Sequence, residues 1–222
     1  MSGDIEDESE PDLMSVEIPW PVANDVLVAG GPDWRLNAAV GWQLGDWYSY
    51  ASGYKTAAEI LSTHVEAVGR DQDVLLWPFV MCWRHHIELL LKTLLVVLQN
   101  LHDESPVLMK THSIDLIWQK VKPLLKSVSD SDGEPPEDVE NVDHVIKQLH
   151  AIDGNGEPFR YPVNNSGVSH VFSFRIVNIP AFNASMSRIS SYLDAAYNKL
   201  SNDLDFKWEF ESEMESCYGG DY

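Results

Sequence analysis

Cysteine and basic residues are scarce in this chain of 222 residues. The two cysteines lie far apart, Cys82 in an apolar stretch and Cys217 in an acidic one, so we expect no structural disulfide and a reducing compartment. Lysine and arginine number 15 against 35 aspartates and glutamates, which gives a formal net charge of −20. Such a chain repels phosphate backbones, and this counts against non-specific binding to nucleic acids.

The sequence also has few features of a membrane or secreted protein. Residues 1–20 contain no basic region followed by an apolar run, so no secretory signal is expected. The longest apolar stretch, residues 74–98, carries five titratable side chains near its midpoint: Arg84, His85, His86, Glu88 and Lys92. Charges at that depth would be very costly in a bilayer. The stretch therefore predicts a buried helix of a cytoplasmic protein with no membrane association.

Motifs for cofactors and metals are absent as well. We find no GxGxxG, no P-loop, no GxSxG, no HExxH and no pair of cysteine ligands. Adjacent histidines, as at positions 85 and 86, point about a third of a turn apart on a helix and do not easily bind one metal ion. The sequence predicts neither a metal site nor a cofactor.

The apolar residues that are present follow a helical period along most of the chain. Spacings of three and four predict helices over residues 46–68, 71–100, 114–127, 136–152 and 180–204. Residues 159–163 and 171–179 lack that period and resemble short strands. The predicted fold is all-α: a bundle of four to five helices with a small β-hairpin insertion before the last helix.

Acidic residues are concentrated at the two ends. We expect residues 1–20 to form a disordered acidic tail and residues 206–222 a second acidic tail, with one helical domain over residues 21–205. Dense carboxylates can imitate a nucleic acid, so one functional alternative is an inhibitor that occupies a basic partner.

A ladder of charges marks the second predicted helix. Arg84, Glu88 and Lys92 are spaced four apart, so they lie on one face with alternating sign. The ladder either lies on an open face or forms a buried polar network, and burial requires partners. The candidates are three residues beside predicted turns: His112, Arg160 and Tyr161.

Two of these candidates have both a structural and a functional interpretation. His112 precedes Ser113, the expected N-cap of a helix, where the helix dipole disfavours imidazolium and favours a neutral ring that can act as a base. Otherwise it is a capping or surface histidine. Arg160 lies between Phe159 and Tyr161 in a turn that either anchors on the bundle, with Arg160 paired to Glu88, or faces a ligand.

Three short patches, in this order, resemble a branch of the HEPN-like superfamily. They are the RHHIELLLK run at residues 84–92, the helix start led by His112, and the FRYP turn at residues 159–162. The resemblance implies a helical bundle, frequently a homodimer, in prokaryotic defence or toxin–antitoxin settings. Catalytic members are metal-independent ribonucleases with an arginine followed, after four to six residues, by histidine.

No arginine of this chain has a histidine at that spacing. The resemblance therefore favours a non-catalytic module that acts through self-association or by binding a protein or RNA partner. The alternative is a ribonuclease with a rearranged site. In it His86 or His112 would take the proton of a ribose 2′-hydroxyl, and Arg84 or Arg160 would stabilise the phosphorane.

Overall fold

The computed structural model describes residues 20–41, 46–133 and 135–218. The chain divides into two units, Met1–Leu44 and Gly45–Tyr222. In the first unit, the described residues form turns and the short 3-10 helix η2 (Trp34–Leu36), whose N-cap Asp33 accepts a hydrogen bond from the backbone of Arg35. The acidic tail expected over residues 1–20 lies outside the described residues, apart from Trp20.

The described residues of the second unit form five α-helices, so the prediction of an all-α bundle is confirmed. They are α1 (Trp47–Val68), α2 (Gln72–Leu101), α3 (Ile114–Asp132), α4 (Pro136–Ile152) and α5 (Ile179–Tyr218). Capping residues define several ends. Asp46 accepts a hydrogen bond from the backbone of Tyr48 at the start of α1, and Gly69 ends that helix in the left-handed conformation. Ser113 caps α3 by accepting a hydrogen bond from the backbone of Leu116.

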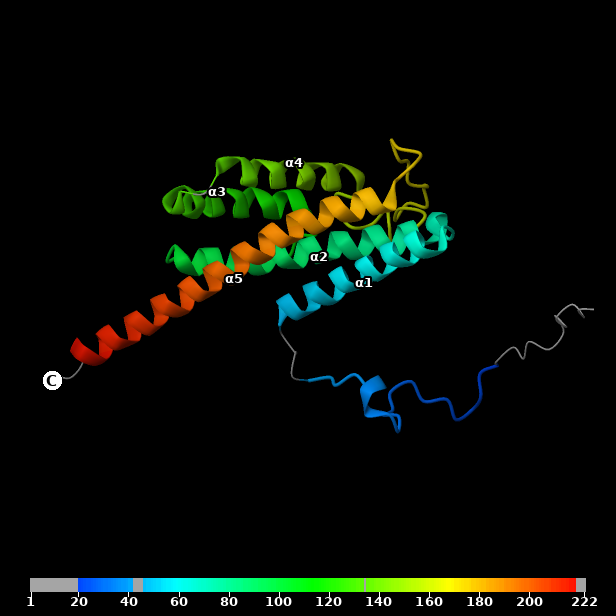
Figure 1. Cartoon of the computed structure of the whole chain (residues 1–222), viewed down its shortest axis with the longest axis horizontal. Coiled ribbons are helices and arrows are strands. Elements are labelled where there is room, and N and C mark those ends of the chain that lie inside the picture. Colours follow the sequence, from blue (N-terminus) through cyan, green and yellow to red (C-terminus); the bar gives the residue numbers. More distant parts are fainter. Residues whose placement is uncertain (1–19, 42–45, 134, 219–222) are drawn as a thin grey trace, which may run out of the picture. The chain divides into compact units, whose positions relative to one another are not determined.

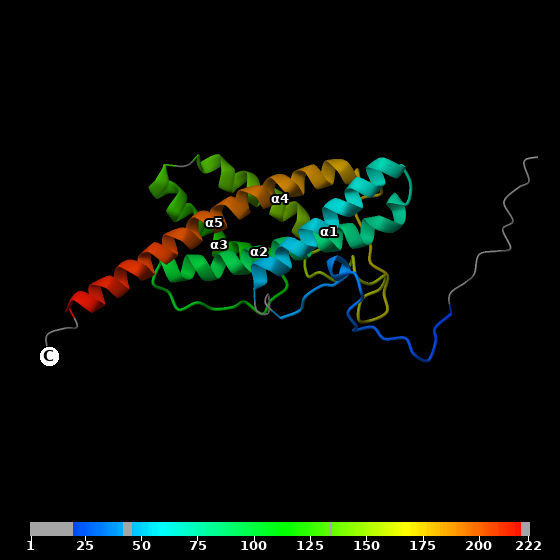
Figure 2. The ribbon, with the colours of Figure 1, turned by 60° about the horizontal axis from the view of Figure 1, so that its bottom comes forward.

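Helix α2 is the centre of the bundle. It packs against α1, α3 and α5, and α4 packs on α3 and α5 (Figure 1 and Figure 2). Most side chains from Phe79 to Leu98 are buried, as expected for a helix that is apolar around much of its circumference. Pro78 lies within α2, which begins at Gln72. None of the described helices is long and apolar enough to cross a membrane.

The predicted β-hairpin is wrong. Between α4 and α5 the described residues form turns and one isolated antiparallel bridge, Val163 to Ser169. The aromatic residues that resembled strand residues instead pack on one another: the ring centroid of Phe172 lies 5.3 Å from that of Phe159 and 5.1 Å from that of Phe174. Side-chain packing, rather than a strand ladder, holds this segment on the bundle.

Two helices extend further than the apolar period indicated. Helix α3 continues to Asp132, where Gly133 caps it in the left-handed conformation. Helix α5 continues to Tyr218, through most of the segment expected as an acidic tail, and residues 219–222 lie outside the described part. In both ribbon views the C-terminal end of α5 projects past the other helices (Figure 1 and Figure 2).

Candidate functional site

The charge ladder of α2 lies inside the bundle. Arg84 and Glu88 are each 1% exposed and Lys92 is 5% exposed. The Nη1 atom of Arg84 lies 2.7 Å from Oε2 of Glu88, and Nζ of Lys92 lies 2.9 Å from Oε1 of the same carboxylate. One buried carboxylate therefore serves two buried cations from the same helix.

The guanidinium of Arg84 uses each of its three nitrogens within the protein. Nε donates to the carbonyl oxygen of Asp153 at 3.1 Å, Nη1 donates to Glu88, and Nη2 donates to the carbonyl oxygen of His112. Asp153 is the C-cap of α4, where a cation is favoured by the helix dipole. Arg84 thereby joins α2 to the end of α4 and to the segment that leads into α3.

A glycine makes room for this arginine. Gly156 has a φ of +80°, and a Cβ atom at this position would lie 2.9 Å from Nη1 of Arg84. The backbone N–H of Gly156 donates to Oδ1 of Asp153 at 2.7 Å. The turn after α4 is therefore shaped around the guanidinium.

The two carboxylates of the network have opposite pKa shifts. Burial on its own raises the pKa of Glu88, but hydrogen bonds from Lys92 and Arg84 outweigh burial and lower it. For Asp153, burial is the dominant effect and raises the pKa, although the nearby Arg84 opposes it. Oδ2 of Asp153 lies 3.7 Å from Nε of Arg84 and has no hydrogen-bond partner among the described residues.

The ring of His112 connects the buried network to the surface. Its Nδ1 atom lies 2.9 Å from Oε1 of Glu88, while 61% of its side chain is exposed. His112 is thus the one exposed side chain that contacts the Glu88 carboxylate among the described residues.

A second polar cluster surrounds His86, on another side of α2. Its Nδ1 lies 2.9 Å from the carbonyl oxygen of Ala51, and its Nε2 lies 2.8 Å from Oγ of Ser190. Burial lowers the pKa of His86 and favours the neutral ring. Because a carbonyl can only accept, Nδ1 carries the proton of the neutral ring. The hydroxyl of Ser190 has one proton, for which Nε2 of His86 and Oδ2 of Asp194 are both acceptors. Asp194 lies 3.2 Å from that hydroxyl and 2.9 Å from Nζ of Lys55, so this cluster ties α1, α2 and α5 together.

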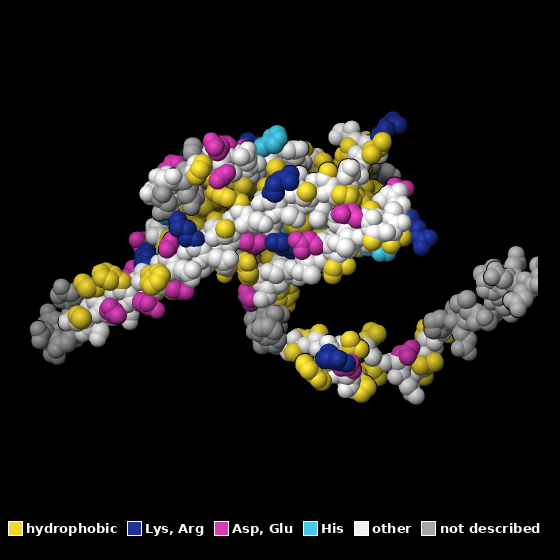
Figure 3. Space-filling view, viewed as in Figure 1, with side chains coloured by type: hydrophobic (Ala, Val, Ile, Leu, Met, Phe, Trp, Pro, Cys, Tyr) yellow, Lys and Arg dark blue, Asp and Glu magenta, His cyan; other side chains and the backbone are white. Residues whose placement is uncertain are grey.

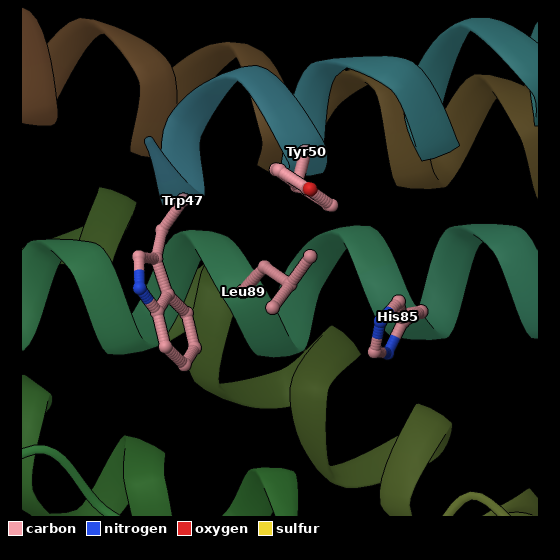
Figure 4. Close-up of a pocket in the computed structure, with 4 residues that line it drawn as sticks. All are labelled: Trp47, Tyr50, His85 and Leu89. Carbon is pink, nitrogen blue, oxygen red and sulfur yellow. The ribbon is translucent and has the colours of Figure 1, made fainter. Parts of the chain in front are cut away.

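His85 faces a shallow pocket between α1 and α2. Trp47 and Tyr50 of α1 and His85 and Leu89 of α2 line it, and its volume is about 250 Å³ (Figure 4). Small-molecule sites usually measure about 300–1,000 Å³. Burial lowers the pKa of His85, whose ring packs edge-on against Tyr54 with centroids 4.4 Å apart. The pocket is too small to indicate a ligand by itself.

Arg160 and Tyr161 do not join the buried network. Phe159 anchors their turn in the core, with its ring centroid 5.7 Å from that of Trp77. The side chains of Arg160 and Tyr161 are exposed. The oxygens of Glu88, the expected partner of Arg160, are occupied by Arg84, Lys92 and His112 instead. The structure thus brings Arg84, Glu88, Lys92 and His112 together, with His85 beside them, and leaves His86, Arg160 and Tyr161 elsewhere.

Four residues of these clusters were missed by reasoning from the sequence. They are Asp153 in the first cluster and Lys55, Ser190 and Asp194 in the second. Asp153 had one local signal: it is a carboxylate placed between a predicted helix and a glycine turn. The other three carry no signal, because serine, lysine and aspartate on exposed-looking helix positions are ordinary. No group of three or more metal-binding side chains occurs in the described residues.

No protein-family model, no curated protein and no solved structure matches this chain. The function is therefore inferred from the chemistry of the two polar clusters. A carboxylate that orients an exposed imidazole can support proton transfer, whereas a fully bonded, buried guanidinium supports the fold.

Proposed function

We propose that this chain is a non-catalytic, HEPN-like helical module that acts by binding a protein partner. The observation that carries the proposal is the state of Arg84, which is 1% exposed and donates from all three nitrogens to acceptors of its own chain. The three sequence patches that resemble the HEPN-like superfamily support the same proposal. By that resemblance the protein acts in a prokaryotic defence or toxin–antitoxin setting. Association into a homodimer is the alternative to binding a different protein.

The position of Arg84 argues against its use on a phosphate. A catalytic arginine must offer N–H groups to the charge that develops in the transition state. To do so, Arg84 would have to leave Glu88 buried without one of its cations, and breaking a buried ion pair costs about 3–5 kcal/mol. His86 is equally unsuited as a base, because it is 1% exposed and both ring nitrogens have partners.

A metal-independent ribonuclease is the second candidate, and one observation favours it. The exposed ring of His112 is held by the buried carboxylate of Glu88 at 2.9 Å, which is how a general base is commonly oriented. In this version His112 takes the proton of a ribose 2′-hydroxyl and the exposed Arg160 stabilises the phosphorane. Arg84 and His86 take no part in the reaction.

An RNA-cleavage assay separates the two candidates. Purified wild-type protein is incubated with transfer RNA and total RNA in the presence of EDTA, beside the double variant His112→Ala/Arg160→Ala. His144→Ala, at an exposed position of α4, is the matched control. We expect no cleavage by any of the three proteins. Cleavage by the wild type and His144→Ala that disappears in the folded double variant would overturn the non-catalytic proposal.

A further inference from the structure

The projecting end of α5 carries an exposed apolar stripe. Phe206, Phe210 and Met214 are spaced four apart, so they lie along one face of the helix. Their side chains are 69%, 64% and 40% exposed. Figure 3 shows hydrophobic side chains together with acidic ones on this projecting end. Solvent-exposed aromatic residues in a row on a helix are the usual anchors of helix-in-groove recognition.

Acidic side chains flank the stripe on both sides. Five carboxylates fall within this end of the helix: Asp205, Glu209, Glu211, Glu213 and Glu215. At 100° per residue, Glu209 and Glu213 fall on one side of the stripe and Glu211 and Glu215 on the other. The single cation, Lys207, is already occupied, because its ammonium contacts the carbonyl oxygens of Asn100 and Leu101.

The charge pattern selects the kind of partner. A second copy of this chain would bring two sets of carboxylates together, and like charges at an interface cost several kcal/mol. An anionic membrane surface and a nucleic acid are repelled for the same reason. A protein groove with an apolar floor would bury the side chains of the stripe, and lysines and arginines along its rim would pair with the flanking carboxylates.

We propose that the end of α5 docks as an amphipathic helix into such a basic-rimmed apolar groove of a partner protein. This inference rests on the proposed function and names its binding surface. Lys207 supports the surface as well: by capping the last carbonyls of α2 at 3.1 and 3.3 Å, it fixes the base of the projecting end. The segment is then helical before it binds, which reduces the ordering cost of association.

The test uses the full chain and a defined probe. The probe is a fluorescein-labelled two-helix hairpin peptide whose helices form a groove with leucines along its floor and lysines along both rims, and binding is followed by fluorescence anisotropy. The stripe variant is Phe206→Ser/Phe210→Ser, and its matched control is Ile60→Ser/Leu116→Ser, which removes two exposed apolar side chains elsewhere. The charge variant is Glu209→Gln/Glu213→Gln, with Glu104→Gln/Glu137→Gln as its control.

We expect the stripe variant to weaken binding by about tenfold or more, as loss of a central anchor does. The charge variant should weaken binding severalfold and reduce its dependence on salt, and both controls should stay within about twofold of the wild type. Equal binding by the wild type and the stripe variant would overturn the proposal, since carboxylates alone then attract the probe. Failure of the wild type to bind the probe would overturn it too.

Light scattering over a range of protein concentrations tests the alternative that a second copy of this chain binds the stripe. A wild type that dimerises and a stripe variant that stays monomeric would assign the stripe to a second copy and overturn the proposed groove. That result leaves the non-catalytic proposal intact, because only the RNA-cleavage assay can overturn it.

Discussion

At the scale of single residues, Gly156 determines how closely the chain can approach Arg84. Its φ of +80° is costly for any side chain, and a Cβ atom there would lie within 3.0 Å of the guanidinium carbon as well as of Nη1. We expect Gly156→Ala to lower the free energy of unfolding by more than the about 1–2 kcal/mol that a left-handed backbone costs a non-glycine residue. Urea denaturation followed by tryptophan fluorescence measures this change.

Gly167 provides the matched control for that measurement. Its φ of +75° is nearly the same, but a Cβ atom there would meet nothing within 4 Å. Gly167→Ala therefore carries the backbone cost alone, and the difference between the two variants isolates the contact with Arg84. Equal losses in both variants would show that the turn adjusts without disturbing the guanidinium.

The residues of the ladder illustrate what the sequence could and could not provide. The spacing of Arg84, Glu88 and Lys92 places them on one helix face, so their mutual contacts were predictable. His112 was named as a candidate partner, but the acceptor of Arg84 at Asp153, 69 positions along the chain, was not predictable, nor was the use of the His112 backbone carbonyl. Sequence periodicity describes the neighbours on one helix, whereas partners from other elements depend on how the helices pack.

At the scale of elements, the hydrogen bond between His86 and Ser190 connects α2 to α5. Ser190→Ala removes the hydroxyl and leaves Nε2 of a fully buried imidazole without a donor. Such an unsatisfied buried group costs about 1–3 kcal/mol. We expect Ser190→Ala to lower the free energy of unfolding by this amount, measured by urea denaturation.

The neighbouring serine serves as the control for the helix itself. Ser191 is exposed on the next position of α5, so Ser191→Ala changes helix propensity without touching His86. Its effect should stay within about 0.5 kcal/mol. A loss for Ser191→Ala as large as that for Ser190→Ala would mean that the contact with His86 contributes nothing.

The elements differ in how well the sequence predicted them. Helices α1, α2 and α4 and the start of α3 have clear amphipathic or apolar periods, some with clear caps such as Asp46, Gly69 and Ser113, and the sequence predicts their bounds closely. The sequence predicts strands after α4 because Phe159, Phe172 and Phe174 suit a strand as well as the aromatic cluster that they form. For the end of α5 the sequence predicts a tail, because the many carboxylates there obscure the helical spacing of Phe206, Phe210 and Met214.

At the scale of the whole molecule, three buried titratable groups, His86, Glu88 and Asp153, and the half-buried His85 link stability to pH. Burial lowers the pKa of His85 and of His86 below the ordinary value of 6.5, so the unfolded chain binds protons that the folded chain does not. Their contribution is present above pH 6.5 and is lost as the pH falls. Glu88, with its pKa lowered from 4.5, acts in the same direction at more acidic pH. Asp153, with its raised pKa, opposes it.

We therefore expect the urea midpoint to fall as the pH is lowered from 7 to 5, and to fall again below about pH 4.5. Glu88→Gln should lose about 3–5 kcal/mol at pH 7, because it leaves Arg84 and Lys92 buried without their anion, and should flatten the second decline. Glu140→Gln, which breaks a half-exposed pair with Lys122, should cost at most about 1 kcal/mol. A midpoint that rises on acidification to pH 5 would contradict the assigned directions.

The buried ladder of α2 also restricts how this chain can change over generations. A substitution at Arg84, Glu88 or Lys92 alone strands a charge in the core, whereas well-packed apolar side chains in place of a whole buried ion cluster are often tolerated or even stabilising. We therefore expect the three positions to vary as one unit, so that descendants keep all three charges or exchange them together. A variant that retains only two of the three charged residues is expected to be less stable than either the original or the fully exchanged chain, and so to be selected against.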